Sequence, residues 1–149
     1  TDANYDYMQS IYKRIRDIPN VELYPHLPIN DYAKLLSESH VLLFPSRYES
    51  FGRVVLDALA TGALPVTFNV RGFVRDVLLR STLGEFVVEY GDIATFVSKV
   101  IQIYTIWKRN REKYYELVNE ACKLANRYSW RNVAPLWANA FKEINGDQQ

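Results

Sequence analysis

The sequence has a single cysteine, Cys122, only two histidines and no long run of apolar residues. One cysteine excludes an internal disulfide, and its place in a helical pattern favours a small apolar packing residue over a reactive thiol. No stretch approaches the roughly 20 apolar residues that a membrane-spanning helix needs. The formal net charge of +1 gives no reason to expect a nucleic-acid partner, because such binders usually carry a basic face. We expect a cytoplasmic protein, and peripheral membrane contact of a longer protein stays open.

Several familiar reaction centres are also missing. His26 and His40 have no acidic partner within reach in the sequence, which favours structural roles for both. No cluster of His, Cys, Asp and Glu has the spacing of a metal site, and neither a Ser-His-Asp arrangement nor a Walker motif occurs. The three tryptophans fall on apolar faces of expected helices, so we predict that they lie in the core; they are Trp107, Trp130 and Trp137.

What the chain has is an alternation of helix and strand patterns. Its 149 residues are 48% apolar and 23% charged, which fits one globular domain over residues 1–149. In chain order the patterns predict a helix over 4–18, a strand over 21–24, a helix capped by Asn30 or Asp31, a strand over 40–44, a helix over 50–61 ending at Gly62, a strand over 64–68, a short helix over 73–79 and a strand over 85–89. From Asp92 onward the pattern is all helix, with Ser129 capping the last one.

This alternation predicts an α/β fold: a Rossmann-like open parallel sheet with helices on both faces and an all-helical C-terminal segment. The apolar run His40–Phe44, ended by Pro45, is typical of a strand covered on both faces. In such sheets ligands bind outside the carboxyl ends of the strands. Residues 45–52 and 69–72 both fall there.

The first of these loops combines acids with a helix start. Glu49 precedes Ser50-Phe51-Gly52, which opens the expected helix, and Asp57 follows Glu49 by eight positions. A helix N-terminus favours phosphate, whereas carboxylates accept hydrogen bonds from vicinal hydroxyls. If all eight steps were helical, the two carboxyl groups would differ by about 12 Å along the axis and ~80° around it. That separation suits two contacts on an extended nucleotide sugar; otherwise Glu49 is a helix-dipole partner and Asp57 a solvated residue.

The segment PSRYESFGRVVLDALATGALPV, followed by NVRGFVRDV, resembles the donor-binding signature of retaining GT-B glycosyltransferases of the group 1, family 4 type. The shared pattern is a Pro-Ser turn, two acids separated by seven residues, a small-aromatic-glycine trio and a Gly-Pro-Val strand entry. The likeness covers roughly residues 20 to 144. It implies transfer of a sugar from a nucleoside-diphosphate sugar to an acceptor hydroxyl with retention of configuration.

The resemblance also implies roles for individual residues. Glu49 would contact hydroxyls of the transferred sugar and act as the catalytic position, and the amides of Ser50, Phe51 and Gly52 would face the sugar and distal phosphate. Asp57 stands where the family usually has Glu gripping the ribose diol, and it is one methylene shorter. Gly72 would let the backbone approach the donor. Four arginines lie in or beside these two loops and could offset the diphosphate charge; they are Arg47, Arg53, Arg71 and Arg75. Neither a metal nor another cofactor is expected.

The family's catalytic unit has two Rossmann-like domains, and this chain matches only the second, C-terminal donor half without its first two strands. We therefore expect an N-terminal acceptor domain, or another chain that completes the sheet, and no transferase activity from these 149 residues alone. The shorter Asp57 and the missing strands motivate an alternative, a non-catalytic nucleotide-sugar-binding or interaction module. A sugar-nucleotide epimerase on the same fold ranks third, because no further acid–base residues are visible.

Overall fold

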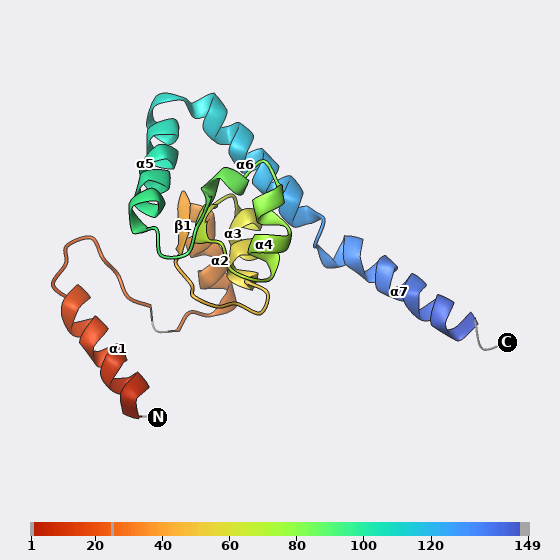
Figure 1. Ribbon diagram of the computed structural model, residues 1–149, viewed down its shortest axis with the longest axis horizontal. Coiled ribbons are helices and arrows are strands. Elements are labelled where there is room, and N and C mark those ends of the chain that lie inside the picture. The colour runs from red at the N-terminus through yellow and green to blue at the C-terminus, as the bar shows by residue number, and fades with distance from the viewer. Residues whose placement is uncertain (1, 25, 147–149) are drawn as a thin grey trace. The chain divides into compact units, whose positions relative to one another are not determined.

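The computed structural model describes residues 2–24 and 26–146, which form seven α-helices, two short 3₁₀ helices and three strands (Figure 1). The chain divides into two compact units, Thr1–Tyr32 and Ala33–Gln149. The elements in chain order are α1 (Asp2–Ile15), α2 (Ile29–Glu38), β1 (Val41–Phe44), α3 (Arg53–Thr61), β2 (Leu64–Phe68), α4 (Phe73–Asp76), η1 (Leu78–Arg80), η2 (Gly84–Phe86), β3 (Val87–Val88), α5 (Ile93–Arg109), α6 (Arg111–Asn126) and α7 (Trp130–Gly146).

The first unit holds α1, an irregular segment and the first turn of α2, residues 29–32. The predicted strand over 21–24 was wrong, because these four residues have no regular structure and their side chains are exposed. A strand needs a neighbour to pair its backbone groups, and within the described residues the sheet contains only β1, β2 and β3. The Tyr24 hydroxyl instead donates a hydrogen bond to the carboxylate of nearby Glu22, and this contact raises the pKa of Tyr24.

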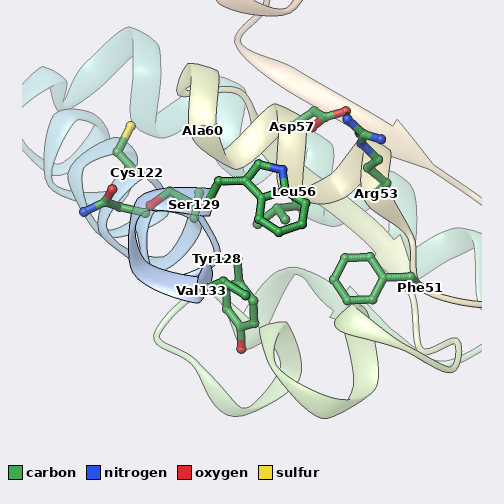
Figure 2. Close-up of a pocket in the computed structure, with 12 residues that line it drawn as sticks. Phe51, Arg53, Leu56, Asp57, Ala60, Cys122, Tyr128, Ser129 and Val133 are labelled. Atoms are coloured by element: carbon green, nitrogen blue, oxygen red, sulfur yellow. Dashed lines mark ion pairs between the residues drawn. The ribbon is translucent and has the colours of Figure 1, made fainter. Parts of the chain in front are cut away.

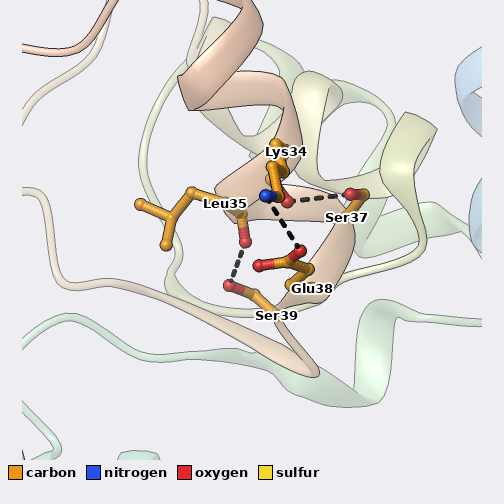
Figure 3. A network of polar contacts seen from close by, with 5 residues as sticks. All are labelled: Lys34, Leu35, Ser37, Glu38 and Ser39. Carbon is orange, nitrogen blue, oxygen red and sulfur yellow. Dashed lines mark hydrogen bonds and ion pairs between the residues drawn. The ribbon is translucent and has the colours of Figure 1, made fainter.

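Helix α2 begins earlier than the capping pattern predicted. The N–H of Tyr32 donates to the carbonyl of Pro28 at 2.9 Å, so the first turn already includes Asn30 and Asp31, and neither of them is the cap. Its last turn is closed by two serine hydroxyls, which donate to backbone carbonyls one turn earlier (Figure 3). Ser37 reaches the carbonyl of Lys34 at 2.8 Å, and Ser39 reaches that of Leu35 at 2.7 Å. These contacts end the helix just before β1.

The sheet is parallel, and β2 is its central strand in the order β1-β2-β3. The register pairs Val41 with Leu64 and Thr67 with Val87. All five residues of β2 are buried, whereas β1 is an edge strand in which Leu43 is 53% exposed. The prediction that 40–44 is covered on both faces was therefore wrong, because the Leu43 side chain is exposed and the other residues of β1 are only half-buried. The predicted strand over 85–89 shortens to β3 because residues 84–86 turn into a 3₁₀ helix.

Helices α3, α5 and α6 all pack on β2 and form the core with it (Figure 1). The largest fully buried side chains include Phe73, Phe86, Leu59 and Ile103. In α6 the predicted apolar face is buried, with Val118 only half-buried; the buried members are Tyr114, Leu117, Ala121, Leu124 and Ala125. The fold class predicted from the sequence, a Rossmann-like α/β sheet followed by helices, is confirmed.

Helix α7 behaves differently from α5 and α6. Its first residue, Trp130, is 79% exposed, and Trp137 is also exposed, so the prediction that these two tryptophans lie in the core was wrong. Trp107 is half-buried and packs against the core cluster. The hydroxyl of Ser129 has no hydrogen-bond partner in the described part of the chain, although its carbonyl accepts from the N–H groups of Asn132 and Val133. None of the described helices is long and apolar enough to cross a membrane.

Candidate functional site

The loop after β1 carries Glu49 at the carboxyl end of the sheet. The Ser46 hydroxyl lies 2.9 Å from Oε1 of Glu49 and 3.0 Å from the carbonyl of Tyr48, within hydrogen-bond distance of both. Glu49 is half-buried. The Pro-Ser turn therefore fixes one carboxylate oxygen and leaves the second oxygen available to a ligand.

The loops after β1 and β2 pack directly on each other. At Gly72, φ is +84° and ψ is −146°, a conformation that glycine alone adopts readily. A Cβ at this position would lie 2.7 Å from the carbonyl oxygen of Ser50 and 2.8 Å from Cα of Phe51. The next amide, that of Phe73, donates to the Phe51 carbonyl at 2.8 Å. We refer to these two packed loops, residues 45–52 and 69–72, as the mouth.

Gly72 thus has a structural neighbour that the sequence did not reveal. The sequence analysis expected Gly72 to let the backbone approach a donor. In the structure Gly72 lets the backbone of residues 50–51 pack against residue 72. Asn69 closes the other side of the mouth. Its N–H donates to the carbonyl of Val88 at 2.7 Å and its Nδ2 donates to Glu89 at 3.2 Å, while its buried Oδ1 has no partner among the described residues. Sequence analysis did not single out Asn69 or Glu89 as site residues.

The helix after the mouth begins at Arg53, because Gly52 has a left-handed conformation with φ +86°. Residues 50–52 are therefore loop, which corrects the predicted helix start at residue 50. The helical spacing estimated for the two acids does not apply either, because the stretch from Glu49 to Gly52 is not helical. Asp57 lies one turn into α3, where its Oδ2 is 4.0 Å from Nε of Arg53. The Arg53 side chain is 83% exposed and that of Asp57 is 35% exposed, so this ion pair is weak.

A cavity of about 780 Å³ opens between α3 and the junction of α6 with α7 (Figure 2). Figure 2 shows Arg53 and Asp57 side by side at one end, with Ala60 and Cys122 at the other. Three predicted site residues line the cavity, namely Phe51, Arg53 and Asp57. The remaining wall is formed by Leu56, Ala60, Cys122, Ala125, Asn126, Tyr128, Ser129, Trp130 and Val133.

Three rings connect the mouth to the far wall of this cavity. The Phe51 and Phe73 ring centroids are 5.7 Å apart, and Phe73 meets Tyr128 edge-on at 5.2 Å. Such aromatic contacts add stability beyond simple burial. The mouth and the α6–α7 junction are therefore packed as one site, although more than 50 residues separate them in the sequence.

The structure separates the predicted residues into two groups. Five of them belong to the loops next to the cavity and do not line it, and these are Glu49, Ser50, Gly52, Arg71 and Gly72. Among the four arginines in or beside the mouth, which are all exposed, only Arg53 lines the cavity. Sequence reasoning missed Tyr128, Ser129 and Trp130, because a helix boundary with an aromatic on each side reads as ordinary packing.

Comparison with known proteins adds to this geometry. Residues 3–105 match the family described as Glycosyl transferases group 1. The chain is 27% identical over 144 residues to the capsular polysaccharide biosynthesis glycosyltransferase CapM of Staphylococcus aureus, covering 93% of this chain and 36% of that protein. It is 28% identical over 125 residues to a glycogen [starch] synthase of Dictyostelium discoideum, covering 78% of this chain and 14% of the synthase.

A third relative, also from Dictyostelium discoideum, is the GDP-Man:Man(3)GlcNAc(2)-PP-Dol alpha-1,2-mannosyltransferase, with 24% identity over 139 residues, 93% of this chain and 26% of that enzyme. The chain thus spans about a third or less of the length of these relatives. The family match extends across β1, the mouth and α3, where the sequence signature was found. On this evidence the chain belongs to the group 1 glycosyl transferases.

Proposed function

We propose that this chain is the nucleotide-sugar-binding, C-terminal part of a retaining glycosyltransferase, with residues 1–149 forming one N-terminally incomplete donor domain. The observation that carries the proposal is the mouth. Gly72 lets two loops at the carboxyl ends of β1 and β2 pack together, with Glu49 held by Ser46 and α3 starting directly behind them. This is where an open α/β sheet binds its ligand.

In the proposed arrangement each part of the donor meets a different part of the site. The second oxygen of Glu49 accepts hydrogen bonds from hydroxyls of the transferred sugar. The diphosphate lies at the start of α3, near the amides of Ser50, Phe51 and Gly52, where the helix dipole favours negative charge. Arg53 and Arg71 offset the remaining phosphate charge.

Asp57 completes the donor contacts, because its carboxylate accepts hydrogen bonds from the two hydroxyls of the ribose diol. Because Asp57 pairs with Arg53 over 4.0 Å, that arginine turns from the carboxylate to the phosphate when the donor binds. Arginine, helix dipole and amides supply the positive potential, so the proposal includes neither a metal nor another cofactor. Among the described residues no group of three or more His, Cys, Asp and Glu comes together as a metal site would require.

The proposed reaction exchanges one bond at the anomeric carbon. The bond to the diphosphate oxygen breaks, and a bond to the acceptor oxygen forms on the same face of the sugar. The departing phosphate takes the acceptor proton, while the mouth positions the donor and stabilises the diphosphate charge. The acceptor belongs to a domain outside these 149 residues, so we expect no transfer from this chain alone.

The name of one relative supports a proposal about the acceptor and about where the protein acts. One of them is named for a PP-Dol-linked acceptor, which a membrane carries. We therefore propose a cytoplasmic enzyme whose full-length form contacts a membrane surface, with a nucleotide sugar and the acceptor domain as its partners.

Titration of the chain with UDP, GDP and ADP and their sugar conjugates, followed by ligand-observed NMR, tests the donor site. We expect one nucleotide sugar to bind selectively, and both Glu49→Ala and Asp57→Ala to weaken it by about tenfold or more, the effect of losing a charged hydrogen bond. Glu143→Gln, a change at an exposed acid of α7, is the matched control and leaves affinity unchanged. Equal affinity of all four proteins would contradict the proposal.

The short side chain of Asp57, whose carboxylate lies 4.0 Å from Arg53, also leaves a second candidate, a non-catalytic binding module. The two candidates differ in the longer protein. A transferase consumes donor when acceptor is supplied, whereas a binding module binds the nucleotide weakly and leaves the donor intact.

A further inference from the structure

Helix α5 has two apolar faces, of which one packs on the core and the other is exposed. Phe96 and Ile103 are buried on the first face. The second face carries apolar side chains at spacings of four, four and three residues, each between 50% and 61% exposed; they are Ile93, Val97, Ile101 and Tyr104. None of these side chains belongs to the core cluster, and a contiguous exposed apolar surface marks a place where another molecule binds. We refer to these four residues as the exposed stripe.

The charge of α5 identifies the class of partner that fits this stripe. The 17 residues of the helix include three basic residues and no acidic residue. Nζ of Lys99 lies 3.8 Å from a carboxylate oxygen of Glu85, whereas Lys108 and Arg109 have no ion pair among the described residues. An apolar stripe on a helix with unpaired positive charge is typical of helices that bind an anionic surface with an apolar interior.

The exposed stripe ends at a cluster of basic side chains around one indole ring. Nζ of Lys108 lies 4.7 Å from the ring centroid of Trp107, and the guanidinium carbon of Arg111 lies 4.3 Å from it. The His40 ring meets the same indole edge-on at 4.6 Å. We refer to these four residues as the basic corner. Arg111 also lacks an ion pair in the described part of the chain, and it begins α6, where the helix dipole disfavours a cation. An anion bound here would relieve this repulsion.

Two cavities share His40 and Trp107 in their walls and differ in polarity. One measures about 210 Å³, and Arg111 lines it together with hydroxyl-bearing residues, which are Ser37, Ser39, Thr61, Tyr114 and Tyr115. Glu38 lines this cavity too, but it pairs with Lys34 at 3.9 Å (Figure 3). The other cavity measures about 290 Å³, and its remaining wall is mostly aliphatic, with Val41, Val100, Ile103 and Tyr104. A polar cavity with an arginine next to an apolar one suits a ligand whose phosphate is joined to an apolar chain.

Helix α7 also carries exposed apolar side chains, but its charges are arranged differently. Its basic residues, Arg131 and Lys142, are eleven positions apart, and Glu143 follows the second of them. Among the described residues the contacts between cations and aromatic rings involve Trp107 and Tyr104 of α5 and no ring of α7. Charge complementarity with an anionic surface therefore favours α5, and α7 supplies matched controls.

We propose that the exposed stripe and the basic corner together bind the surface of an anionic lipid bilayer. The stripe lies at the boundary between headgroups and acyl chains, with α5 in the plane of the membrane. The aromatic rings of Tyr104 and Trp107 lie at headgroup level, and Lys108 and Arg111 bind lipid phosphate groups. The assignment rests on the membrane contact that the proposed function gives to the longer protein, and it names the helix that makes this contact.

Co-sedimentation with lipid vesicles tests this surface. The 149-residue chain is mixed with vesicles of phosphatidylcholine alone, and with vesicles containing about one third phosphatidylglycerol, which have a negative surface potential. We expect binding to the anionic vesicles, and added salt should weaken it because the cations are exposed. Lys108→Gln and Arg111→Gln should each lower the partition coefficient roughly fivefold, the contribution of one cation near an anionic surface. Ile101→Ser should lower it roughly tenfold, because an exposed isoleucine no longer enters the apolar layer.

Changes on α7 are the matched controls. Lys142→Gln removes an exposed cation, and Leu136→Ser removes an exposed aliphatic side chain. Both should bind the vesicles like the wild type, and circular dichroism spectra show whether every variant keeps the fold. Equal weakening by the α5 and α7 changes would overturn the assignment to α5. Equal binding of the wild type to both kinds of vesicle would overturn it as well.

Other occupants of this surface give different results. If the chain binds glycerol 3-phosphate in an NMR titration and neither kind of vesicle, the basic corner is a site for a soluble phosphate and the lipid surface is overturned. If sedimentation velocity shows a dimer that Ile101→Ser dissociates, again without vesicle binding, a second copy covers the stripe. The nucleotide titration described above reports on the donor site separately. Nucleotide binding without vesicle binding would remove this surface and leave the donor proposal standing, whereas the reverse result would remove the donor site alone.

Discussion

Helices α6 and α7 are neighbours in the chain, have similar lengths and carry apolar residues at the same helical spacing. In α6 that face is buried against α3, α5 and β2. In α7 the corresponding side chains are exposed apart from half-buried Val133, and the exposed ones include Trp130, Trp137, Phe141 and Ile144. Two nearly equal sequence patterns therefore have opposite environments.

The difference shows that apolar spacing predicts a shared helix face but does not predict burial. Spacing decides which side chains share one face of a helix. Burial requires a second surface. Helix α6 packs against the sheet and its helices, whereas in α7 only Val133 is half-buried among the described residues. The free energy gained by burial therefore differs between the two helices, although their patterns do not.

Replacing one leucine in each helix tests this comparison most strongly. Leu117 of α6 is 6% exposed and Leu136 of α7 is 66% exposed. We expect Leu117→Ala to lower the free energy of unfolding by about 2–5 kcal/mol, because it removes buried methyl groups and leaves a cavity. Leu136→Ala should change it by about 0.5 kcal/mol or less. Urea unfolding followed by circular dichroism measures both.

Equal effects of the two leucine replacements would break the comparison. A large loss for Leu136→Ala would mean that α7 is packed against a surface in solution. Repeating the measurement at two protein concentrations then distinguishes a second copy of the chain from an intramolecular surface, because only the former makes stability depend on concentration.

The mouth allows a similar comparison between two glycines. Gly72→Ala places a Cβ within 3 Å of the backbone of residues 50–51, whereas a Cβ at Gly91 meets nothing within 4 Å. Both have positive φ, so each alanine costs about 1 kcal/mol or more of backbone strain, and at Gly72 the ψ of −146° adds to that strain. We expect Gly72→Ala to cost about 1–3 kcal/mol beyond Gly91→Ala, because the loops must separate. Thermal unfolding measures the difference, and equal melting temperatures would contradict the packed mouth.

The fold was predictable wherever local pattern and burial agree. The predicted strands over 40–44 and 64–68 correspond to β1 and β2, and the helix ending at Gly62 and the helix beginning at Asp92 correspond to α3 and α5. Prediction failed at 21–24, where the residues have a strand-like pattern but no partner strand in the described sheet. It also failed at Leu43, whose apolar side chain is exposed. In both cases the missing information concerns neighbours, which a local pattern does not contain.

The candidate site was predictable in part for the same reason. Glu49, Gly72 and Asp57 follow from a motif that is contiguous in the sequence. The far wall of the cavity comes from a helix boundary more than 50 residues later, where Trp130 was assigned to the core. That assignment rested on the apolar pattern of α7, so the error about α7 and the error about the site have one cause.

A pH measurement sharpens the comparison between buried and exposed side chains on α6 itself. Burial raises the pKa of Tyr114, whereas its neighbour Tyr115 is exposed. A raised pKa in the folded state stabilises the fold below the unfolded value of 10.0, and this contribution is lost as pH rises through the folded pKa. We expect the urea midpoint of the wild type to fall between pH 9 and pH 11, and Tyr114→Phe to reduce this fall. Tyr115→Phe should leave it as in the wild type.

The smallest effect is expected at the caps that begin α5 and α6. Asp92 accepts a hydrogen bond from the N–H of Thr95 at 3.0 Å, and this bond lowers the pKa of its carboxyl group. Asn110 accepts from the N–H of Lys113 at the same distance but does not titrate. A lowered pKa stabilises the fold above the unfolded value of 3.8, and the contribution is lost as pH falls through the folded pKa. Asp92→Asn should therefore reduce the dependence of the urea midpoint on pH between 5 and 3. Asn110→Ser should change the midpoint by the same amount at pH 5 and at pH 3. A pH dependence that Asp92→Asn leaves unchanged would show that carboxylates elsewhere, and not this cap, govern acid stability.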